Sequence, residues 1–551
     1  MTVTGGVRER GEPSPADGVA ASRAGGAFPF DDLAERAMRV AWLWPALLTF
    51  LFGCYELTRS ELWRDELSSW SFATRPVSQL INIVHHTDAT QLGYYLLLHF
   101  WIVVFGDSVV AMRLLSVLAM AGAAACVTLV GRRLADARAG LLAGLIFALV
   151  PSVSRFAQEA RFYALQVLVA MLATLLLLRA LDRPTPRRWV AYCVSLVLVG
   201  YVDLVALCLL AGHAGMVAMW WWRERGPGGR SGLVGRGDPG GRSGLVGRGN
   251  TATSRRQLIW FAAAAVIACA ACLPIALVGL GQAGVQLEWL FRPGLSLNTF
   301  GFFGRNLFYS TAAAAALIIV AVFAWAVAWR PAAAATSIAV LPVAMVWVIS
   351  QGAHSYFFPR YLLFTVAAWA LLAGIAFGKL DVRLAAAVVL IFYVLGAGDQ
   401  GVIREPGAHT WAEYPVNQNT DYWDFAGAAR VVAQRAHPGD GIVYPGSPIR
   451  WMMIDYGVWY YLEHDLPGGR MPREVFVART AAAAGTLYPI DCANPAVCLG
   501  RTSRVWMVNY GYLKRPYQDI PADQAAVLRA HYRVNLVRHM PSLTVFLLVR
   551  T

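Results

Sequence analysis

Two adjacent carboxylates, Asp65 and Glu66, follow the first apolar run of the chain within the sequence Leu-Trp-Arg-Asp-Glu-Leu at 62–67. An ionised group at membrane depth costs roughly 2.5–3.5 kcal/mol on insertion scales, so charges in such places usually mark a site. A carboxylate can accept a proton from a hydroxyl nucleophile as a new bond forms. The pair therefore predicts acid–base chemistry, with both residues as catalytic candidates. Acids also suit the first turn of a helix, and Glu66 could instead be structural, holding Asp65 or a neighbouring arginine.

The composition is that of a protein with many membrane spans. The chain has 551 residues, of which 57% are hydrophobic and 15% charged, and its mean hydropathy is +0.49. Such values exclude an ordinary soluble protein. The net charge of +14 does not indicate a nucleic-acid partner, because the arginines gather at the ends of apolar runs, where cytoplasmic loops carry them. Abundant arginine, scarce lysine and long alanine runs favour a protein of the bacterial inner membrane.

Apolar runs of spanning length predict a polytopic α-helical membrane protein with about eleven spans. The short apolar run at 92–105 is interpreted as a helix lying along the membrane surface. On this count the arginine-rich loops fall on the cytoplasmic side, which places the N-terminus inside and the C-terminus outside. The predicted spans lie near residues 38–58, 109–131, 138–154, 161–180, 188–202, 204–222, 257–279, 310–329, 333–350, 360–378 and 382–398.

These spans divide the chain into three parts. Residues 1–37 are polar and rich in Gly, Pro and Arg, which is typical of a disordered cytoplasmic tail. Residues 38–398 form the predicted transmembrane catalytic domain. Within it, the first external loop at 59–108 carries juxtamembrane helices, and a Gly- and Arg-rich repeat at 223–256 forms a flexible cytoplasmic linker. Residues 399–551 are expected to form an extracytoplasmic domain, since their number is enough for independent folding.

The C-terminal part alternates helix-like and strand-like segments, which indicates an α/β domain. Cys492 and Cys498 lie there, six residues apart, whereas the other cysteines lie in apolar runs. A disulfide between them would require an oxidising compartment; the alternative is two free thiols. Helices are predicted near 423–432, 451–462 and 522–530, and strands near 441–444, 505–508 and 543–549.

Arginines from two later segments are expected at the same outer surface as the carboxylates. Arg161 and Arg360 begin predicted spans, and each is closely followed by a tyrosine, Tyr163 and Tyr361. A guanidinium group matches phosphate oxygens bidentately and stabilises a phosphate leaving group. These residues predict a lipid-phosphate site. The structural alternatives are a pair between Arg161 and Glu159, and anchoring of either arginine at the lipid headgroups.

Other polar side chains of the outer loops are candidates for binding the substrate. They are Arg64, His86, Asp88, Glu159 and Asp203. Asp203 could instead be a turn residue between two spans. His85 and His86 are more often surface groups than zinc ligands, so no dedicated metal site is predicted. Asp88 could join Asp65 in holding a divalent cation, and no other cofactor is expected.

Four segments resemble the motifs of one group of enzymes. In order, between residues 38 and about 400, they are similar to motifs of the polyprenyl-phosphate-dependent glycosyltransferases of the C-type fold, which include protein O-mannosyltransferases and aminoarabinose transferases. The resemblance implies that fold and an inverting, single-displacement transfer, with Asp65 as the base and Arg161 and Arg360 near the lipid phosphate. The four segments are Leu62–Glu66, Gly93–Trp101, Gln158–Leu165 and Pro359–Leu362.

The resemblance also implies the substrates and the place of action. The donor would be a polyprenyl-phosphate-linked sugar, mannose or a pentose, and the acceptor a cell-envelope glycan, lipid or protein at the outer face of the inner membrane. Two departures leave the sugar open. The chain has His86–Gln91 where the group has His-Pro-Pro, and Tyr201–Asp203 where it has Thr-His-Tyr.

Two other functions fit a protein with many spans. A lipid-linked sugar flippase or transporter would carry charges near the membrane midplane, often in inverted repeats, whereas here the spans themselves are nearly free of charge. A scaffold whose external domain binds envelope polymers would have no need of the four motifs. Glycosyl transfer is therefore the function that the sequence favours.

Overall fold

The computed structural model describes residues 1–2, 5, 40–225, 251–407, 422–447, 449–466 and 471–551. The predicted tail at 1–37 and the repeat within 223–256 lie almost entirely outside the described residues. The chain divides into two compact units, Met1–Ala41 and Trp42–Thr551, and the second contains all the elements discussed below.

The second unit is built on membrane-type helices. Within the described part of the chain, seven helices are long and apolar enough to cross a membrane, and a bent pair adds an eighth. The bent pair is α7 (Ala137–Leu149) and α8 (Pro151–Ala157), which meet at 66°, with Pro151 at the start of the second helix. The seven segments are Val109–Leu134 (α6), Tyr163–Asp182 (α9), Leu204–Trp222 (η2 and α11), Arg255–Gln286 (within α12), Thr311–Ile349 (α14), Pro359–Phe377 (η3 and α15) and Val382–Val402 (α16).

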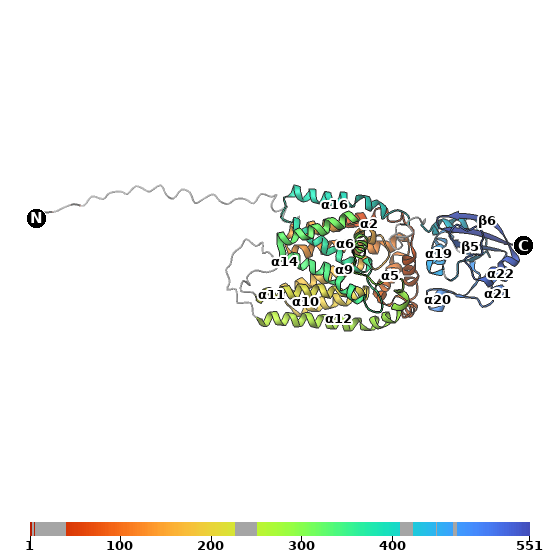
Figure 1. The fold of residues 1–551 in the computed structure, drawn as a ribbon, viewed down its shortest axis with the longest axis horizontal. Coiled ribbons are helices and arrows are strands. Elements are labelled where there is room, and N and C mark those ends of the chain that lie inside the picture. The colour runs from red at the N-terminus through yellow and green to blue at the C-terminus, as the bar shows by residue number, and fades with distance from the viewer. Residues whose placement is uncertain (3–4, 6–39, 226–250, 408–421, 448, 467–470) are drawn as a thin grey trace. The chain divides into compact units, whose positions relative to one another are not determined.

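The helical membrane architecture is confirmed, but the predicted count of eleven spans is not. The segments predicted at 310–329 and 333–350 are two helices that share the label α14 and meet at a kink, where Ala328 has non-helical dihedral angles shortly before Pro331. The first predicted span contains the 12-residue helix α2 (Leu43–Cys54). The segment at 188–202 is α10 (Pro186–Val202), which packs against both α9 and α12 (Figure 1).

The loop after α2 folds into short helices instead of a further span. They are α3 (Arg64–Ala73), α4 (Val77–Val84), the 3₁₀ turn η1 (Ala89–Gln91) and α5 (Leu92–Phe105). Helix α5 has 14 residues, so it is about 21 Å long at 1.5 Å per residue. This length is short of a hydrocarbon core of about 30 Å, which agrees with the juxtamembrane helix expected from the sequence.

The paired carboxylates lie in the first turn of α3. Trp63 precedes this helix in an extended conformation, and its backbone N–H donates to Glu66 Oε2 at 3.4 Å. A carboxylate at this place satisfies a backbone donor that the helix leaves free and interacts favourably with the helix dipole. This hydrogen bond favours the structural role considered for Glu66 in the sequence analysis, because the side chain stabilises the start of α3.

The C-terminal part forms a five-stranded mixed sheet with the strand order β2-β1-β5-β7-β6. Strand β1 pairs in parallel with β2 and β5, and β7 pairs antiparallel with β5 and β6. The strands are β1 (Gly441–Val443), β2 (Arg473–Glu474), β5 (Arg504–Tyr510), β6 (Tyr532–Met540) and β7 (Leu543–Arg550). A separate pair joins β3 (Val477–Arg479) to β4 (Ile490–Asp491).

Alternating side chains of β5 are buried in two different hydrophobic cores, one on each face of the sheet. Trp506 and Val508 belong to the core that includes residues of α18 (Phe425–Ala433) and α19 (Ile454–Asp465). Val505 and Met507 belong to a second core with residues of α22 (Ala522–His531). Because side chains alternate across a strand, helices cover both faces of the sheet (Figure 1). The short helices α20 (Ala481–Ala484) and α21 (Pro495–Leu499) complete this region.

The predicted elements of the C-terminal part are present, but both edge strands of the sheet, β2 and β6, and the separate pair β3-β4 were missed. Strand β2 has only two residues, and most side chains of β6 are exposed or half-buried, so these edge strands carry little of the alternating apolar pattern on which the prediction depends. The predicted disulfide is present between Cys492 and Cys498. It closes a short loop that begins just after β4.

We expect this disulfide to persist in the purified protein. When the protein is denatured in detergent and alkylated without a reductant, peptides containing Cys492 and Cys498 should remain unmodified, whereas Cys269, an exposed free cysteine, should be fully alkylated. Reduction before alkylation should label all three residues. Labelling of Cys492 or Cys498 before reduction would contradict the disulfide.

Candidate active site

A cavity of about 530 Å³ brings together side chains from most of the segments singled out in the sequence. Its wall combines the first loop, the start of α9, the turn between α10 and η2, helices α12 and α14, the start of η3, and four residues of the C-terminal part, Trp451, Met453, Leu487 and Tyr488. Of the predicted site residues, those that line it are Arg64, Asp65, Asp88, Arg161, Asp203, Arg360 and Tyr361.

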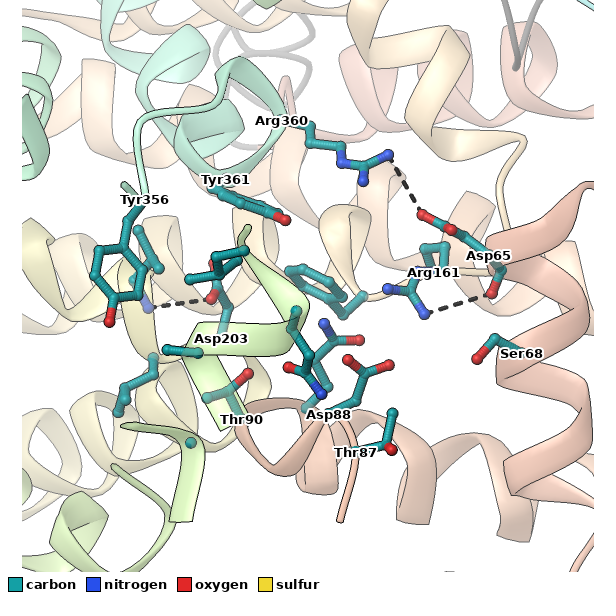
Figure 2. A pocket seen from close by; sticks show the side chains of 18 of the residues that line it. Asp65, Ser68, Thr87, Asp88, Thr90, Arg161, Asp203, Tyr356, Arg360 and Tyr361 are labelled. Carbon is teal, nitrogen blue, oxygen red and sulfur yellow. Dashed lines mark hydrogen bonds and ion pairs between the residues drawn. The ribbon is translucent and has the colours of Figure 1, made fainter. Parts of the chain in front are cut away.

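Asp65 is held among three arginines. Its Oδ1 accepts from Arg64 Nε at 3.3 Å, and its Oδ2 lies 3.3 Å from Arg360 Nη1. Arg161 Nη1 approaches the backbone oxygen of Asp65 at 3.4 Å. Figure 2 shows the side chains of Arg161 and Arg360 both directed toward this residue.

Charge, not burial, determines the ionisation of Asp65. Burial alone would raise the pKa of its carboxyl group, but the positive charges of Arg360, Arg64 and Arg161 outweigh this effect and lower the pKa to about 2. An opposite charge within a few ångströms favours the ionised form of an acid. Asp65 is therefore a carboxylate at every physiological pH.

Arg161 is fixed by hydroxyl groups on its inner side. It lies on the turn between α8 and α9 and is buried. Its Nη1 donates to Ser69 Oγ at 3.2 Å and to the Tyr95 hydroxyl at 3.1 Å. These contacts tie the arginine to α3 and α5, so its position depends on the fold of the first loop.

Arg360 sits among aromatic rings at the start of η3 (Pro359–Thr365). Its guanidinium carbon lies between 5.2 and 5.8 Å from four ring centroids. Rings at this distance stabilise a cation and restrict its rotamers without using its hydrogen-bond donors. The four rings belong to Trp63, Tyr163, Phe358 and Tyr361. Tyr163 is buried and does not line the cavity, so the structure places it beneath Arg360 and not at the predicted phosphate.

Glu66 points away from the cavity and into a buried ion pair. Its side chain is 0% exposed, and both carboxylate oxygens accept from Arg113, at 2.9 Å from Nε and 2.8 Å from Nη2. The backbone N–H of Ala160 donates to Glu66 Oε1 at 2.8 Å. The prediction of a catalytic Glu66 does not fit this geometry, because both carboxylate oxygens already accept hydrogen bonds from Arg113 and from backbone N–H groups. Glu66 instead holds the neighbouring segments in position.

Glu159 is likewise enclosed. Its Oε2 pairs with Arg155 Nη1 at 2.6 Å, and its Oε1 accepts from Trp63 Nε1 at 3.1 Å. It does not line the cavity, so the structure does not support the predicted contact with substrate. The alternative ion pair of Glu159 with Arg161 is not formed either, because Glu159 pairs with Arg155 instead.

Asp88 and Asp203 both reach the cavity, from different elements. Asp88 has a left-handed backbone conformation with φ of 58°, which is uncommon for a residue other than glycine and which often marks a functional position. Burial raises the pKa of its carboxyl group, and Tyr95 donates to its Oδ2 at 2.9 Å. Asp203 stands between α10 and η2, where it accepts from the side chain of Gln166 and from the backbone N–H of Val205.

His86 is exposed and is not part of the cavity wall, so the structure does not bring it to the predicted substrate site. Three residues that the sequence reasoning missed help to hold the site: Ser69, Tyr95 and Arg113. Arg113 carried the clearest signal, because it is a charge near the start of a long apolar helix. Tyr95 lies within the motif segment Gly93–Trp101, which did not single it out from its neighbours, and Ser69 has no distinctive sequence context.

The prediction of a shared divalent cation remains a prediction. Across the described ranges, no group of three or more His, Cys, Asp or Glu side chains lies close enough to hold a metal ion. Asp65 and Asp88 line the same cavity, but both oxygens of Asp65 already face guanidinium groups. Positive charge at this place is thus supplied by the protein itself.

Comparisons with known proteins bear on the fold. A family model described as dolichyl-phosphate-mannose-protein mannosyltransferase matches residues 90–212. The crystal structure of ArnT from Cupriavidus metallidurans in the apo state is similar over 94% of this chain and 97% of its own, with 14% identity and a TM-score of 0.52. ArnT from the same organism bound to undecaprenyl phosphate is similar over 95% and 98%, with 15% identity and a TM-score of 0.50.

The chain has the fold of ArnT. The similarity extends over nearly the whole length of both proteins, so the helical part and the C-terminal part of the present chain belong to one fold. No curated protein sequence matches the chain. The roles of its residues therefore rest on the contacts that they make in this structure.

The pair between Glu66 and Arg113 should be essential for folding. Substituting Arg113→Met leaves a buried, unpaired carboxylate, and breaking a buried pair in this way costs about 3–5 kcal/mol. We expect a large loss of folded protein in detergent, measured by thermal unfolding and gel filtration. The matched control is Arg59→Met at the exposed pair of Arg59 with Glu56, which should unfold like the unmodified protein. Equal stability of the two variants would contradict a central role for the buried pair.

Proposed function

We propose that the chain is an inverting glycosyltransferase that moves a sugar from a polyprenyl-phosphate donor to a hydroxyl group of a cell-envelope acceptor. The observation that carries the proposal is the convergence of Asp65, Arg161 and Arg360 on one cavity. A base and two phosphate-binding cations are the groups that such a transfer needs. The C-type fold and the matching family model give independent support.

In the proposed reaction, Arg161 and Arg360 bind the donor phosphate. The acceptor oxygen attacks the anomeric carbon while the bond from that carbon to the phosphate oxygen breaks, and the electron pair leaves with polyprenyl phosphate. The acceptor proton passes to Asp65. The arginines stabilise the charge that develops on the leaving phosphate, where a preorganised cation is more effective than water. One displacement at one carbon inverts the configuration.

Donor binding also prepares the base. Arg360 is paired with Asp65 in the structure and helps to lower the pKa of the carboxyl group to about 2, which makes Asp65 a weak base. A phosphate that draws Arg360 away removes part of this stabilisation and raises the pKa of Asp65. The base therefore becomes effective when the donor is in place, which limits reaction in its absence.

Asp88 and Asp203 are proposed to recognise the sugar. Carboxylates accept hydrogen bonds from sugar hydroxyl groups, and Thr87, Thr90 and Gln91 line the same part of the cavity. In Figure 2, Asp203 lies on the side of Tyr356 and Thr90, away from Asp65. Neutral sugars such as mannose or a pentose fit this lining, whereas an acidic sugar would be repelled by the two carboxylates.

The apolar side of the cavity suits the lipid. Side chains of α12 and α14 form it, and an isoprenoid chain can replace lipid against them at little cost. They include Ala276, Leu280, Ala283, Leu287, Val346 and Ile349. We infer that the donor enters from the membrane between these helices, with its phosphate toward Arg161 and Arg360.

The site is proposed to face the outside of the inner membrane, with the N-terminus in the cytoplasm. The disulfide between Cys492 and Cys498 supports this orientation, because it requires an oxidising compartment. The distribution of arginine among the loops supports it as well. A glycan, lipid or protein of the cell envelope would then be within reach, and no nucleotide sugar would be needed.

Asp65→Asn should abolish transfer. The substitution keeps the shape of the side chain but removes the base, so we expect a loss of about 10²–10⁴-fold in kcat with donor binding retained. Transfer is measured in proteoliposomes with synthetic polyprenyl-phosphate mannose and arabinose donors. Glu56→Gln, at a nearby exposed acid, is the control. Unchanged turnover in a well-folded Asp65→Asn protein would refute the base, and vectorial movement of the lipid without a covalent product would indicate a flippase.

Arg64→Gln should change the pH dependence of the reaction. The pKa of Asp65 is depressed in the folded protein, so the active carboxylate is lost only as the pH falls through that low value. Removing one of its cations raises the pKa, and the acidic limb of kcat/KM should move to higher pH. Rates measured from about pH 2.5 to about pH 6, where the acidic limb lies, record this shift. Arg59 pairs with Glu56 and not with Asp65, so Arg59→Gln should keep the pH profile of the unmodified protein. Identical pH profiles for the two variants would contradict the lowering of the Asp65 pKa by Arg64.

A further inference from the structure

The C-terminal part of the chain contributes its own wall to the cavity. Trp451, Met453, Leu487 and Tyr488 line it together with residues of the membrane helices. Trp451 lines this cavity and is 39% exposed. A large aromatic side chain left accessible on a cavity wall provides a surface that a ligand can cover.

The segment that carries Leu487 and Tyr488 is rigidly attached. Arg75 Nη2, on the loop after α3, donates to the backbone oxygen of Thr486 at 3.0 Å. The hydroxyl of Tyr456, in α19, donates to the backbone oxygen of Leu487 at 2.7 Å. A segment held from two directions presents its side chains in one geometry, and a preorganised surface binds with less loss of entropy.

The other end of this segment is anchored by Arg450. Its Nη1 donates to the backbone oxygen of Pro489 at 3.3 Å, and its Nη2 bonds both oxygens of Asp491, at 2.7 and 2.9 Å. Arg450 directly precedes Trp451 in the turn η5 (Ile449–Met452). One arginine therefore sets the spacing between the two aromatic side chains, Trp451 and Tyr488.

The aromatic wall reaches the proposed base through a single side chain. The guanidinium carbon of Arg64 lies 5.2 Å from the centroid of the Trp451 ring, and the Nε of Arg64 donates to Asp65 Oδ1 at 3.3 Å. A group bound against Trp451 is thus separated from the Asp65 carboxylate by one guanidinium group, that of Arg64. Since Arg161 and Arg360 are proposed to hold the phosphate, the Arg64 side of Asp65 is the side left for an acceptor hydroxyl.

We propose that Trp451 and Tyr488 form an acceptor subsite that binds a sugar ring, so that the acceptor is a glycan or glycolipid. The inference rests on the proposed function and names its acceptor class. Sugar rings have apolar C–H faces that pack on aromatic rings, and hydroxyl edges that bond to polar tips such as the Tyr488 hydroxyl and the Arg64 guanidinium. The cavity wall therefore matches a ring that is apolar on its faces and polar at its edges.

The first experiment measures acceptor binding without any donor. Saturation-transfer NMR records the binding of linear tetrasaccharides of mannose, arabinose and galactose, and of a Ser- and Thr-containing peptide, to the full-length protein in detergent. We expect at least one tetrasaccharide to bind, the peptide to give no signal, and the signal to disappear in Trp451→Ala. Tyr512→Ala, which removes a 60% exposed aromatic side chain of the same region, should keep full binding.

The second experiment measures transfer kinetics with the bound tetrasaccharide as acceptor. Trp451→Ala and Tyr488→Ala should each raise the acceptor KM about tenfold and leave the donor KM unchanged, and Trp451→Phe should restore most of the loss. An unchanged acceptor KM in both alanine variants, or binding of the peptide alone, would overturn the subsite. Tetrasaccharide binding that depends on Trp451, in a protein that transfers no sugar, would refute the proposed function and still support the subsite.

Discussion

The candidate site depends on the buried ion pair of Glu66 with Arg113. Glu66 belongs to the first turn of α3, Arg113 to the first turns of α6, and Ala160, whose N–H also bonds Glu66, to the turn before α9. Arg113 further donates to backbone oxygens of Leu57, Ser60 and Glu61. One carboxylate and one guanidinium group therefore join three segments of the chain. Each charge is satisfied by the other and by backbone groups, which is the condition under which buried charges are tolerated.

This arrangement separates the two adjacent acids into different roles. Successive residues of a helix point about 100° apart, so Asp65 and Glu66 cannot face the same side of α3. Glu66 faces the protein interior and meets a fixed cation. Asp65 faces the cavity, and the arginines that surround it include two that a phosphate can recruit. The same chemical group is thus structural in one position and available for chemistry in the next.

The electrostatic balance of the cavity favours an anionic substrate. Arg64, Arg161 and Arg360 surround one carboxylate, Asp65, so this part of the site has an excess of positive charge. The rings around Arg360 hold its guanidinium group without neutralising it. Further along the wall the sign changes at Asp88 and Asp203. A phosphate at one end and a polyhydroxylated ring at the other satisfy both regions.

The same cavity also explains why the C-terminal part accompanies the membrane helices. Direct bonds join the two, since Tyr461 accepts from the backbone N–H of Leu62 at 3.1 Å and Tyr460 donates to the backbone oxygen of Asp107 at 3.0 Å. These contacts involve the loop that carries Asp65. An acceptor that packs on Trp451 would therefore be presented by one region to a base supplied by the other.

The sequence by itself determined the class of protein, the approximate positions of most helices, the three central strands of the C-terminal sheet, and the group of residues around Asp65, Arg161 and Arg360. These depend on local patterns: apolar length, side-chain alternation and short motifs. The tertiary structure alone decided that Glu66 and Glu159 are engaged by Arg113 and Arg155, and that His86 is exposed. It also decided that Trp451 and Tyr488 border the cavity, because burial and partners come from segments far apart in the chain, and no local pattern records which segments meet.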